Sequence, residues 1–232
     1  MTQAAARADL LPAADERLEG TRRRLTPRQA EVVANLVRAA AEETEAVGYA
    51  KMTVRSVARR AGVAPATAYT YFSSKDHLLA EVLWRRTEAL PPVAADPGRS
   101  APERVEEAVA QILPFAGRSP ALIDACTVAL ISPHPEVRHL RDRLGALTHR
   151  RLSAALGPDA DPAVVRVLDT LYAGALMAAG TGHMSFQDVP AFMAEAAGLL
   201  VDGEGASPSR HPDPGAPPPA ALRPTTPRRT AR

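Results

Sequence analysis

The sequence predicts an all-α protein made of two helical domains. Alanine, leucine and valine dominate the 46% of residues that are hydrophobic, and aromatic residues make up only 4%. This composition favours helix-on-helix packing over a β-sandwich. Between residues 26 and 202, apolar residues recur at helical spacing. Prolines and glycines divide this region into stretches of the length of single helices.

Composition also excludes several classes of protein. A single cysteine rules out an intramolecular disulfide framework and a cysteine-rich zinc site. No apolar run approaches the roughly 20 residues of a membrane span, and the N-terminus has no apolar signal core. We therefore expect a cytoplasmic protein without a membrane contact and without a cofactor. The net charge is only +2, so any affinity for nucleic acid must come from locally clustered charge.

Three segments fall outside the helical pattern. Residues 1–25 have mixed charge and end in a basic run, and we expect a flexible arm that either reaches a minor groove or is simply solvated. The stretch "PPVAADPGRSAP" at 91–102 separates a domain at 26–90 from a domain at 91–202. Residues 203–232 are rich in Pro, Ser and Arg, and this tail should be disordered because it cannot bury enough apolar surface.

The first two helices have clear boundaries. Thr26 followed by Pro27 is a capping residue followed by proline at the first helical position, and Gly48 closes this first helix. Thr53 can cap a second, short helix, and Gly62 suits a left-handed position after it. This short helix has an apolar inner face and a basic outer face, the latter formed by Arg55, Ser56, Arg59 and Arg60.

The third and fourth helices follow at once. Pro65 opens a helix of about two turns that ends near Phe72, and Ala68 and Phe72 share the face that packs on the core. Ser73 or Ser74 then caps a fourth helix with inward residues Leu78, Leu79, Val82 and Leu83. Two short helices joined by a glycine corner form the helix-turn-helix pattern.

The outer face of the third helix has the chemistry of a nucleic-acid contact. Thr67 and Thr70 can hydrogen-bond bases or phosphates, and a threonine methyl can meet a thymine methyl. Tyrosine hydroxyls such as that of Tyr69 are donors for phosphate oxygens. Lys75 stands at a helix N-terminus, where a cation is locally unfavourable unless a phosphate docks there as well. The alternative is an ordinary three-helix core with a polar surface.

These residues carry a family resemblance. The stretch "TVRSVARRAGVAPATAYTYFSSKDHLLAEV" resembles the DNA-binding segment of TetR-family transcriptional regulators, and the likeness covers residues 26 to 90. It implies that Thr53, Val54 and Arg55 lie near DNA. It also implies that residues at the start and on the outer face of the third helix contact the major groove, and they are Pro65, Ala66, Thr67, Thr70 and Tyr71. Tyr69 and Lys75 would contact phosphates.

One position departs from the family pattern. The third-helix cap is often serine in this family, but Ala64 stands there in this chain. Alanine is a poor cap and costs about 1 kcal/mol. Either Pro65 compensates by preorganising the turn, or one phosphate contact is missing.

The second domain should contain five helices, most of which begin with proline at or near the first turn. The last two have apolar stripes, which include Val164, Leu168 and Tyr172 on one and Val189, Met193 and Leu199 on the other. Either these stripes pack only within the domain, or the two helices pair with their copies in a homodimer. The resemblance implies the homodimer, and its two DNA-binding domains would then bind a palindromic operator on double-stranded DNA.

The resemblance further implies a pocket for an apolar small-molecule effector inside the C-terminal bundle. The candidate lining residues are Phe115, Leu122, Cys126, Leu130, Leu147, Tyr172 and Met177. For each of them plain core packing is the competing interpretation. Occupation of the pocket would shift the geometry of the dimer and so release or retain DNA.

No catalytic motif was found, so we expect that the protein is not an enzyme. His134 and His139 are five residues apart, which is not the spacing of a metal pair on a helix, and His149 and His183 have no acidic partner evident in the sequence. Three functions compete: a repressor that responds to a ligand, an activator or regulator without a small-molecule ligand, and a small helical enzyme with a vestigial N-terminal segment.

Overall fold

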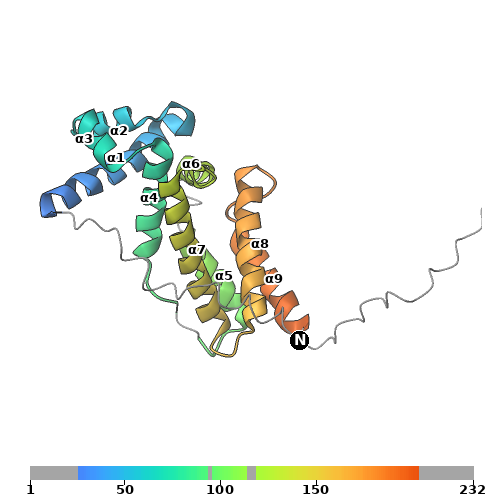
Figure 1. Ribbon diagram of the computed structural model, residues 1–232. Helices are drawn as coiled ribbons and strands as arrows, with labels where there is room; N and C mark the ends of the chain where they lie inside the picture. The colour runs from blue at the N-terminus through green and yellow to red at the C-terminus, as the bar shows by residue number, and fades with distance from the viewer. Residues whose placement is uncertain (1–25, 94–95, 114–118, 204–232) are drawn as a thin grey trace, which may run out of the picture.

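The computed structural model describes residues 26–93, 96–113 and 119–203, and within these ranges the chain is all-helical. The predicted fold class is therefore confirmed. Figure 1 shows α1, α2 and α3 at one end of the molecule, with α5, α8 and α9 at the other end and α4 and α7 between them. The predicted N-terminal arm and C-terminal tail lie outside the described residues.

The N-terminal part consists of four helices, and they are α1 (Pro27–Lys51), α2 (Val54–Arg60), α3 (Pro65–Tyr71) and α4 (Lys75–Glu88). Thr26 and Gln29 form a capping box at the start of α1. Gly48 has φ 74°, which interrupts the helical geometry of α1 at the residue where the sequence predicted its end. Of the two predicted caps for α4, Ser74 is the one used, since its side chain accepts from the backbone N–H of His77.

The C-terminal part consists of five helices, and they are α5 (Ala101–Ile112), α6 (Pro120–Leu130), α7 (Pro135–Leu156), α8 (Pro162–Gly180) and α9 (Val189–Asp202). Each of them has proline in its first two positions, where the missing N–H would have no partner inside the helix. The five helices expected from the sequence are all present.

The two parts share one hydrophobic core. Helix α6 packs against α1 and α4, and α7 packs against α4, α5 and α8. The Cys126 thiol on α6 donates to the carbonyl oxygen of Leu79 on α4 over 3.6 Å. The buried apolar residues of both parts therefore form a single cluster. A shift of α6 or α7 would be transmitted to α4 because close-packed interiors transmit strain.

Helix α8 corrects one expectation from the sequence. By length and composition it is apolar enough to cross a membrane, although no such segment was expected. A mostly buried core helix of a soluble protein passes the same test; α8 packs against α7 and α9, but only 33% of this stretch is buried. It also carries Arg166 and Asp169, which would be costly in a bilayer centre.

Candidate nucleic-acid interface

A tight corner joins α2 to α3. Gly62 has φ 67°, a backbone conformation that glycine adopts without the cost imposed by a Cβ atom. The N–H of Val63 donates to the Ala58 carbonyl over 2.9 Å, which closes the end of α2. At the other end of α2, Thr53 and Ser56 form a capping box. These local signals fix the angle between the two helices of the predicted helix-turn-helix.

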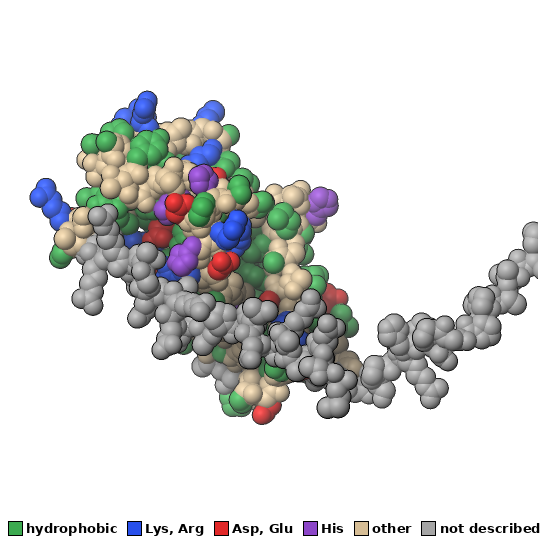
Figure 2. All heavy atoms as spheres, in the orientation of Figure 1, with side chains coloured by type: hydrophobic (Ala, Val, Ile, Leu, Met, Phe, Trp, Pro, Cys, Tyr) green, Lys and Arg blue, Asp and Glu red, His purple; other side chains and the backbone are tan. Residues whose placement is uncertain are grey.

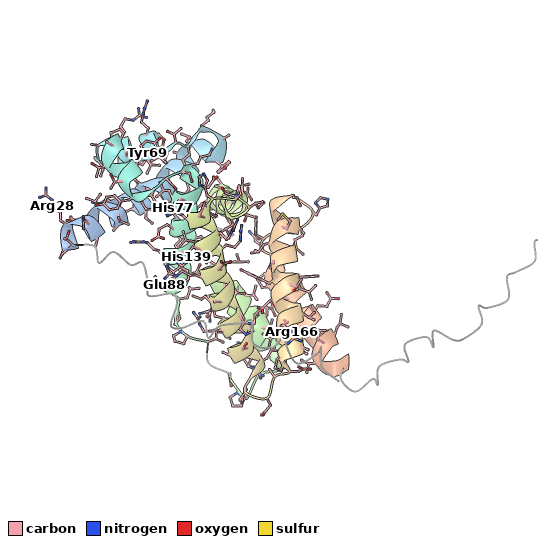
Figure 3. The ribbon with its side chains drawn as sticks, viewed as in Figure 1. Arg28, Tyr69, His77, Glu88, His139 and Arg166 are labelled. Atoms are coloured by element: carbon pink, nitrogen blue, oxygen red, sulfur yellow. The ribbon has the colours of Figure 1, made fainter. Side chains whose placement is uncertain are left out.

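Helix α3 turns one face inward and the other outward. Ala68 is fully buried and Phe72 is 3% exposed, as the sequence predicted. On the outer side Tyr69 is 51% exposed, and Figure 3 shows it at the end of the molecule formed by α1–α3. The predicted major-groove residues on this outer side are all exposed, and they are Pro65, Ala66, Thr67 and Thr70.

The two threonines of α3 are not equivalent. The Thr70 hydroxyl donates to the Ala66 carbonyl over 3.1 Å, so its proton is already used within the helix. No hydrogen bond joins the Thr67 hydroxyl to another described residue. Thr67 therefore keeps both its donor and its acceptor capacity for a base or a phosphate. Tyr71 is half-buried and packs against the core, so its ring is less available than that of Tyr69.

The start of α2 holds one prediction that the structure corrects. Arg55 is exposed, and Thr53 is exposed with its hydroxyl oxygen engaged by the Ser56 N–H over 3.0 Å. Val54, in contrast, is only 4% exposed and belongs to the hydrophobic core. Its side chain supports α2 from inside and is not available to DNA. Figure 2 shows Lys and Arg side chains projecting from this end of the molecule.

The basic face of α2 is also smaller than the sequence indicated. Nε of Arg60 lies 2.7 Å from Oε2 of Glu43 on α1, and Glu43 is buried. The hydrogen bond from Arg60 lowers the pKa of Glu43, although burial acts in the opposite direction. Arg60 therefore links α2 to α1 through this ion pair, which we call the Arg60–Glu43 clamp. Periodicity could not reveal it, because the two partners are 17 residues apart.

This clamp predicts an acid-sensitive contribution to stability. Glu43→Gln should lower the free energy of unfolding by about 1 kcal/mol at pH 7, since Arg60 is partly exposed and solvent screens the pair. The pKa of Glu43 is lower in the folded than in the unfolded state, so the contribution is complete above its ordinary value of 4.5. It is lost as the pH falls through the folded-state value.

Urea unfolding of both proteins at pH 7 and at pH 3 measures this difference. Glu42→Gln is the matched control, because Glu42 makes only an exposed contact with Arg38 at 3.6 Å. A stability difference for Glu43→Gln that did not shrink in acid would contradict the assignment of the clamp.

Lys75 has an intramolecular partner that the sequence did not reveal. Its Nζ donates to the Tyr49 carbonyl over 2.8 Å and lies 3.8 Å from the centre of the Tyr49 ring. The Tyr49 hydroxyl in turn donates to Oδ1 of Asp76 over 2.7 Å. Burial and Asp76 raise the pKa of Tyr49 to about 12, so the phenol keeps its proton. Lys75 thus ties α4 to the end of α1, and two of its three N–H donors are left for a phosphate.

Comparisons with known proteins agree with this geometry. A family model described as bacterial regulatory proteins, tetR family, matches residues 36–82, which include α2 and α3. An HTH-type transcriptional regulator of Mycobacterium tuberculosis is 43% identical over 157 residues, which are 67% of this chain and 73% of the relative. The chain belongs to the TetR family.

Two further proteins resemble this TetR-family regulator, one in sequence and one in fold. The HTH-type transcriptional repressor KstR of Rhodococcus jostii is 34% identical over 172 residues, covering 72% of this chain and 79% of the repressor. A TetR transcriptional regulator from Rhodococcus sp. RHA1 has the same fold, with a TM-score of 0.64 over 76% of this chain and 98% of the other, at 23% identity. TetR-family regulators bind DNA, which agrees with the exposed hydroxyls of α3.

The residues predicted to bind an effector in this TetR-family regulator differ in how deeply they are buried. Leu122, Cys126 and Tyr172 are buried. Burial raises the pKa of the Cys126 thiol to about 12, so Cys126 is a protonated core residue and not a reactive one. Leu130 and Leu147 are partly buried against the same core. Phe115 lies outside the described residues, whereas Met177 is 46% exposed and lies on the outside of α8.

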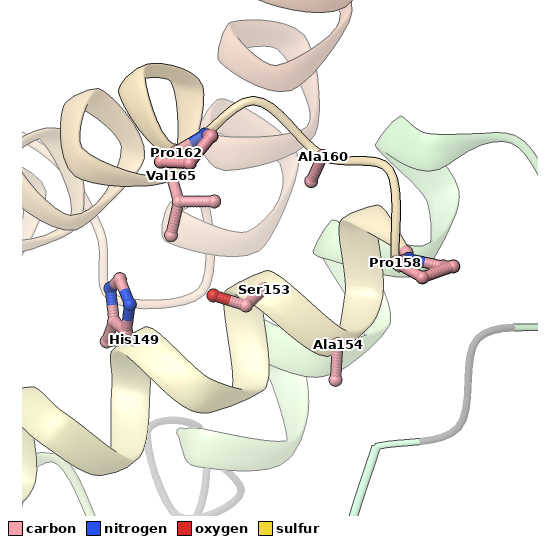
Figure 4. Close-up of a pocket in the computed structure, with 8 residues that line it drawn as sticks. His149, Ser153, Ala154, Pro158, Ala160, Pro162 and Val165 are labelled. Atoms are coloured by element: carbon pink, nitrogen blue, oxygen red, sulfur yellow. The ribbon is translucent and has the colours of Figure 1, made fainter.

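Two cavities of the described part lie elsewhere. One open cavity of about 470 Å³ lies between α7 and α8 and includes His149, Ser153 and Val165 in its wall (Figure 4). Another, of about 550 Å³, lies between α1 and α4. None of the predicted effector residues lines either cavity. In the first, Nδ1 of His149 lies 2.7 Å from Oδ2 of Asp169, an acidic partner that only the pairing of α7 with α8 supplies.

Helices α8 and α9 bury one apolar face and leave another exposed. Val189 and Met193 of the predicted stripe are fully buried inside the protomer, where α9 packs against α5 and α8. These two residues of the stripe are therefore used within their own domain, whereas Leu199 of the same predicted stripe is exposed. A set of three large apolar side chains remains exposed on these helices, namely Val167 and Met177 on α8 and Leu199 on α9. We call this set the outer apolar face.

Proposed function

We propose that this protein is a homodimeric repressor that binds a palindromic operator and leaves it when a small-molecule effector binds. The observation that carries the proposal is the outer side of α3, where exposed Thr67 and Tyr69 stand on a helix fixed from inside by Ala68 and Phe72. A rigid support of this kind is what sequence-specific contacts require. The relative KstR, 34% identical, is a repressor by name, which favours repression over activation.

A single α3 offers few base contacts, and a two-fold dimer would present two of them. In helix-turn-helix dimers the half-sites lie about 34–36 Å apart, one helical turn of DNA. The outer apolar face supports dimerisation, because Leu199 is 72% exposed and such side chains gain most from burial against a partner. Two protomers related by a two-fold axis would each contribute α8 and α9.

Release by an effector needs a path from the C-terminal bundle to α3. The shared core supplies it, since α6 contacts both α1 and α4 and its Cys126 bonds the backbone of α4. A ligand that binds one arrangement of this bundle better than another would shift the population of dimer geometries. The protein would then act in the cytoplasm, where both DNA and metabolites are present.

The test is operator binding by the full-length chain. DNase footprinting on the intergenic DNA upstream of its gene should protect an inverted repeat, and the logarithm of the affinity should fall linearly with that of the salt concentration. Lys75→Ala should lower the affinity for all sequences and reduce the salt slope by about two, because each protomer of the dimer loses one phosphate contact. The mutant's stability must be measured too, because Lys75 also contacts Tyr49. Protection of a single half-site, or affinity indifferent to salt, would contradict the proposal.

A further inference from the structure

An arginine occupies a core position on α7. The inner side of α7 carries buried residues that are otherwise apolar or small, and they are Val137, Leu140, Leu144, Thr148, Leu152 and Ala155. Arg151 lies one turn before Ala155 on the same side, and only 6% of it is exposed. Arginine is almost never buried to this degree unless its charge is paired.

Arg151 is hydrogen-bonded to neutral acceptors only. Its Nη1 donates to the carbonyl oxygen of Pro91 over 2.7 Å, and its Nη2 donates to Oε1 of Gln111 on α5. Its Nε is buried and has no hydrogen-bond partner among the described residues. None of the ion pairs found in the described part of the chain includes Arg151. A positive charge therefore lies in the interior without a carboxylate beside it.

The cost of this burial cannot be removed by loss of a proton. Burial lowers the pKa of Arg151, but a guanidinium starts from so high a value that it stays charged near neutrality. An uncompensated buried charge destabilises a fold, and an anion that reaches it relieves that penalty. Nε is the donor left for such an anion.

A phenol is buried on the neighbouring helix. Tyr172 lies on α8, which packs against α7, and it is 7% exposed. Burial raises the pKa of Tyr172 and Arg151 acts in the opposite direction; the raised value leaves a neutral hydroxyl that can donate a hydrogen bond. The other buried residues of α8 are apolar, and they are Val164, Val165, Leu168, Ala175 and Ala179.

We propose that Arg151 binds the carboxylate of an otherwise apolar effector. This inference rests on the proposed function, because it names the chemical class of the molecule that releases the operator. One uncompensated positive charge matches one negative charge, and an arginine binds a carboxylate through charge-assisted hydrogen bonds. The apolar side chains of α7 and α8 would contact the remainder of the molecule.

The hydrogen bond between Arg151 and Pro91 connects the proposed ligand site to the DNA-binding helices. Pro91, which accepts from Arg151, lies three residues after the end of α4 at Glu88. A carboxylate that reorients the guanidinium competes with the Pro91 carbonyl for its donors. The segment after α4 then loses its hydrogen bond to α7, and the remaining contacts of α4 with α7, from Glu88 and Trp84 to Arg143, can adjust. The start of α4 is the part that Lys75 holds against α1.

The experiment compares charged and uncharged probes of the same shape. Binding of dodecanoate and naphthoate to the full-length protein is measured by calorimetry and by thermal shift, with dodecanol and naphthalenemethanol as uncharged counterparts. At least one acid should bind at least about tenfold more tightly than its alcohol. Arg151→Gln should remove this preference, and Arg150→Gln, at an exposed neighbouring position, should retain it.

Equal binding of acid and alcohol, binding of neither acid, or an acid preference that survives in Arg151→Gln would each overturn the inference. Arg151 would then serve only to hold Pro91 and Gln111. If Arg151→Gln does not fold, Arg151→Lys replaces it: the charge remains but Nε is lost, and the acid should bind at least about threefold more weakly than to the wild type. Footprinting separates the two proposals, since a protein that protects the operator and ignores both acids refutes the inference alone.

Discussion

Replacing Thr67 by alanine should reduce operator affinity by about fivefold to 150-fold. A hydrogen bond from a single hydroxyl contributes about 0.5–1.5 kcal/mol. The proposed two-fold dimer loses it twice, and two distant sites add, so the total is about 1–3 kcal/mol. Thr67 is exposed, so the substitution should leave the free energy of unfolding almost unchanged. Gel shifts with the operator and with half-site variants measure the loss of affinity. They also show at which base pair the variant has lost its sequence preference.

Thr70→Ala is the matched control for this experiment. It makes the same chemical change on the same helix, but the Thr70 hydroxyl already donates to Ala66 within α3. We expect a clearly smaller loss of affinity than for Thr67→Ala. Equal effects of the two substitutions would contradict the distinction drawn between Thr67 and Thr70. If Thr67→Ala lowered the affinity for all sequences alike, Thr67 would contact a phosphate and not a base.

Leu199→Arg should convert the protein into monomers and lower operator affinity by at least about a hundredfold. Leu199 is 72% exposed in the protomer, so the protomer itself gains no strain from a longer, charged side chain. In a two-fold interface the two arginines would be brought together, and their desolvation and repulsion oppose assembly. Sedimentation gives the oligomeric state, and gel shifts give the affinity for the full palindrome and for a half-site.

Ile131→Arg provides the comparison, because Ile131 is 56% exposed and follows α6, outside α8 and α9. It should remain dimeric. A monomeric Ile131→Arg together with a dimeric Leu199→Arg would move the interface from α8 and α9 to α6. Val167→Arg on α8 should behave as Leu199→Arg does if both helices contribute.

Helix boundaries and the inward faces of short helices could be predicted from the sequence, because they depend on local chemistry. A capping residue at Thr26, prolines at the helix starts and a left-handed glycine at Gly62 act within a few residues of themselves. Burial of Ala68 and Phe72 followed from their spacing of four. The resemblance carried by the same stretch indicated the family, which relatives at 43% and 34% identity confirm.

The tertiary structure alone decided which polar groups meet. Glu43 with Arg60, Lys75 with Tyr49, and Arg151 with Pro91 and Gln111 are pairs from different elements, and no periodicity relates them. Local pattern likewise could not show that Met177 is exposed, or that Val189 and Met193 of the predicted α9 stripe are used inside the protomer while Leu199 is exposed. A helix pattern tells which residues share a face, but the partner of that face depends on how the whole chain packs.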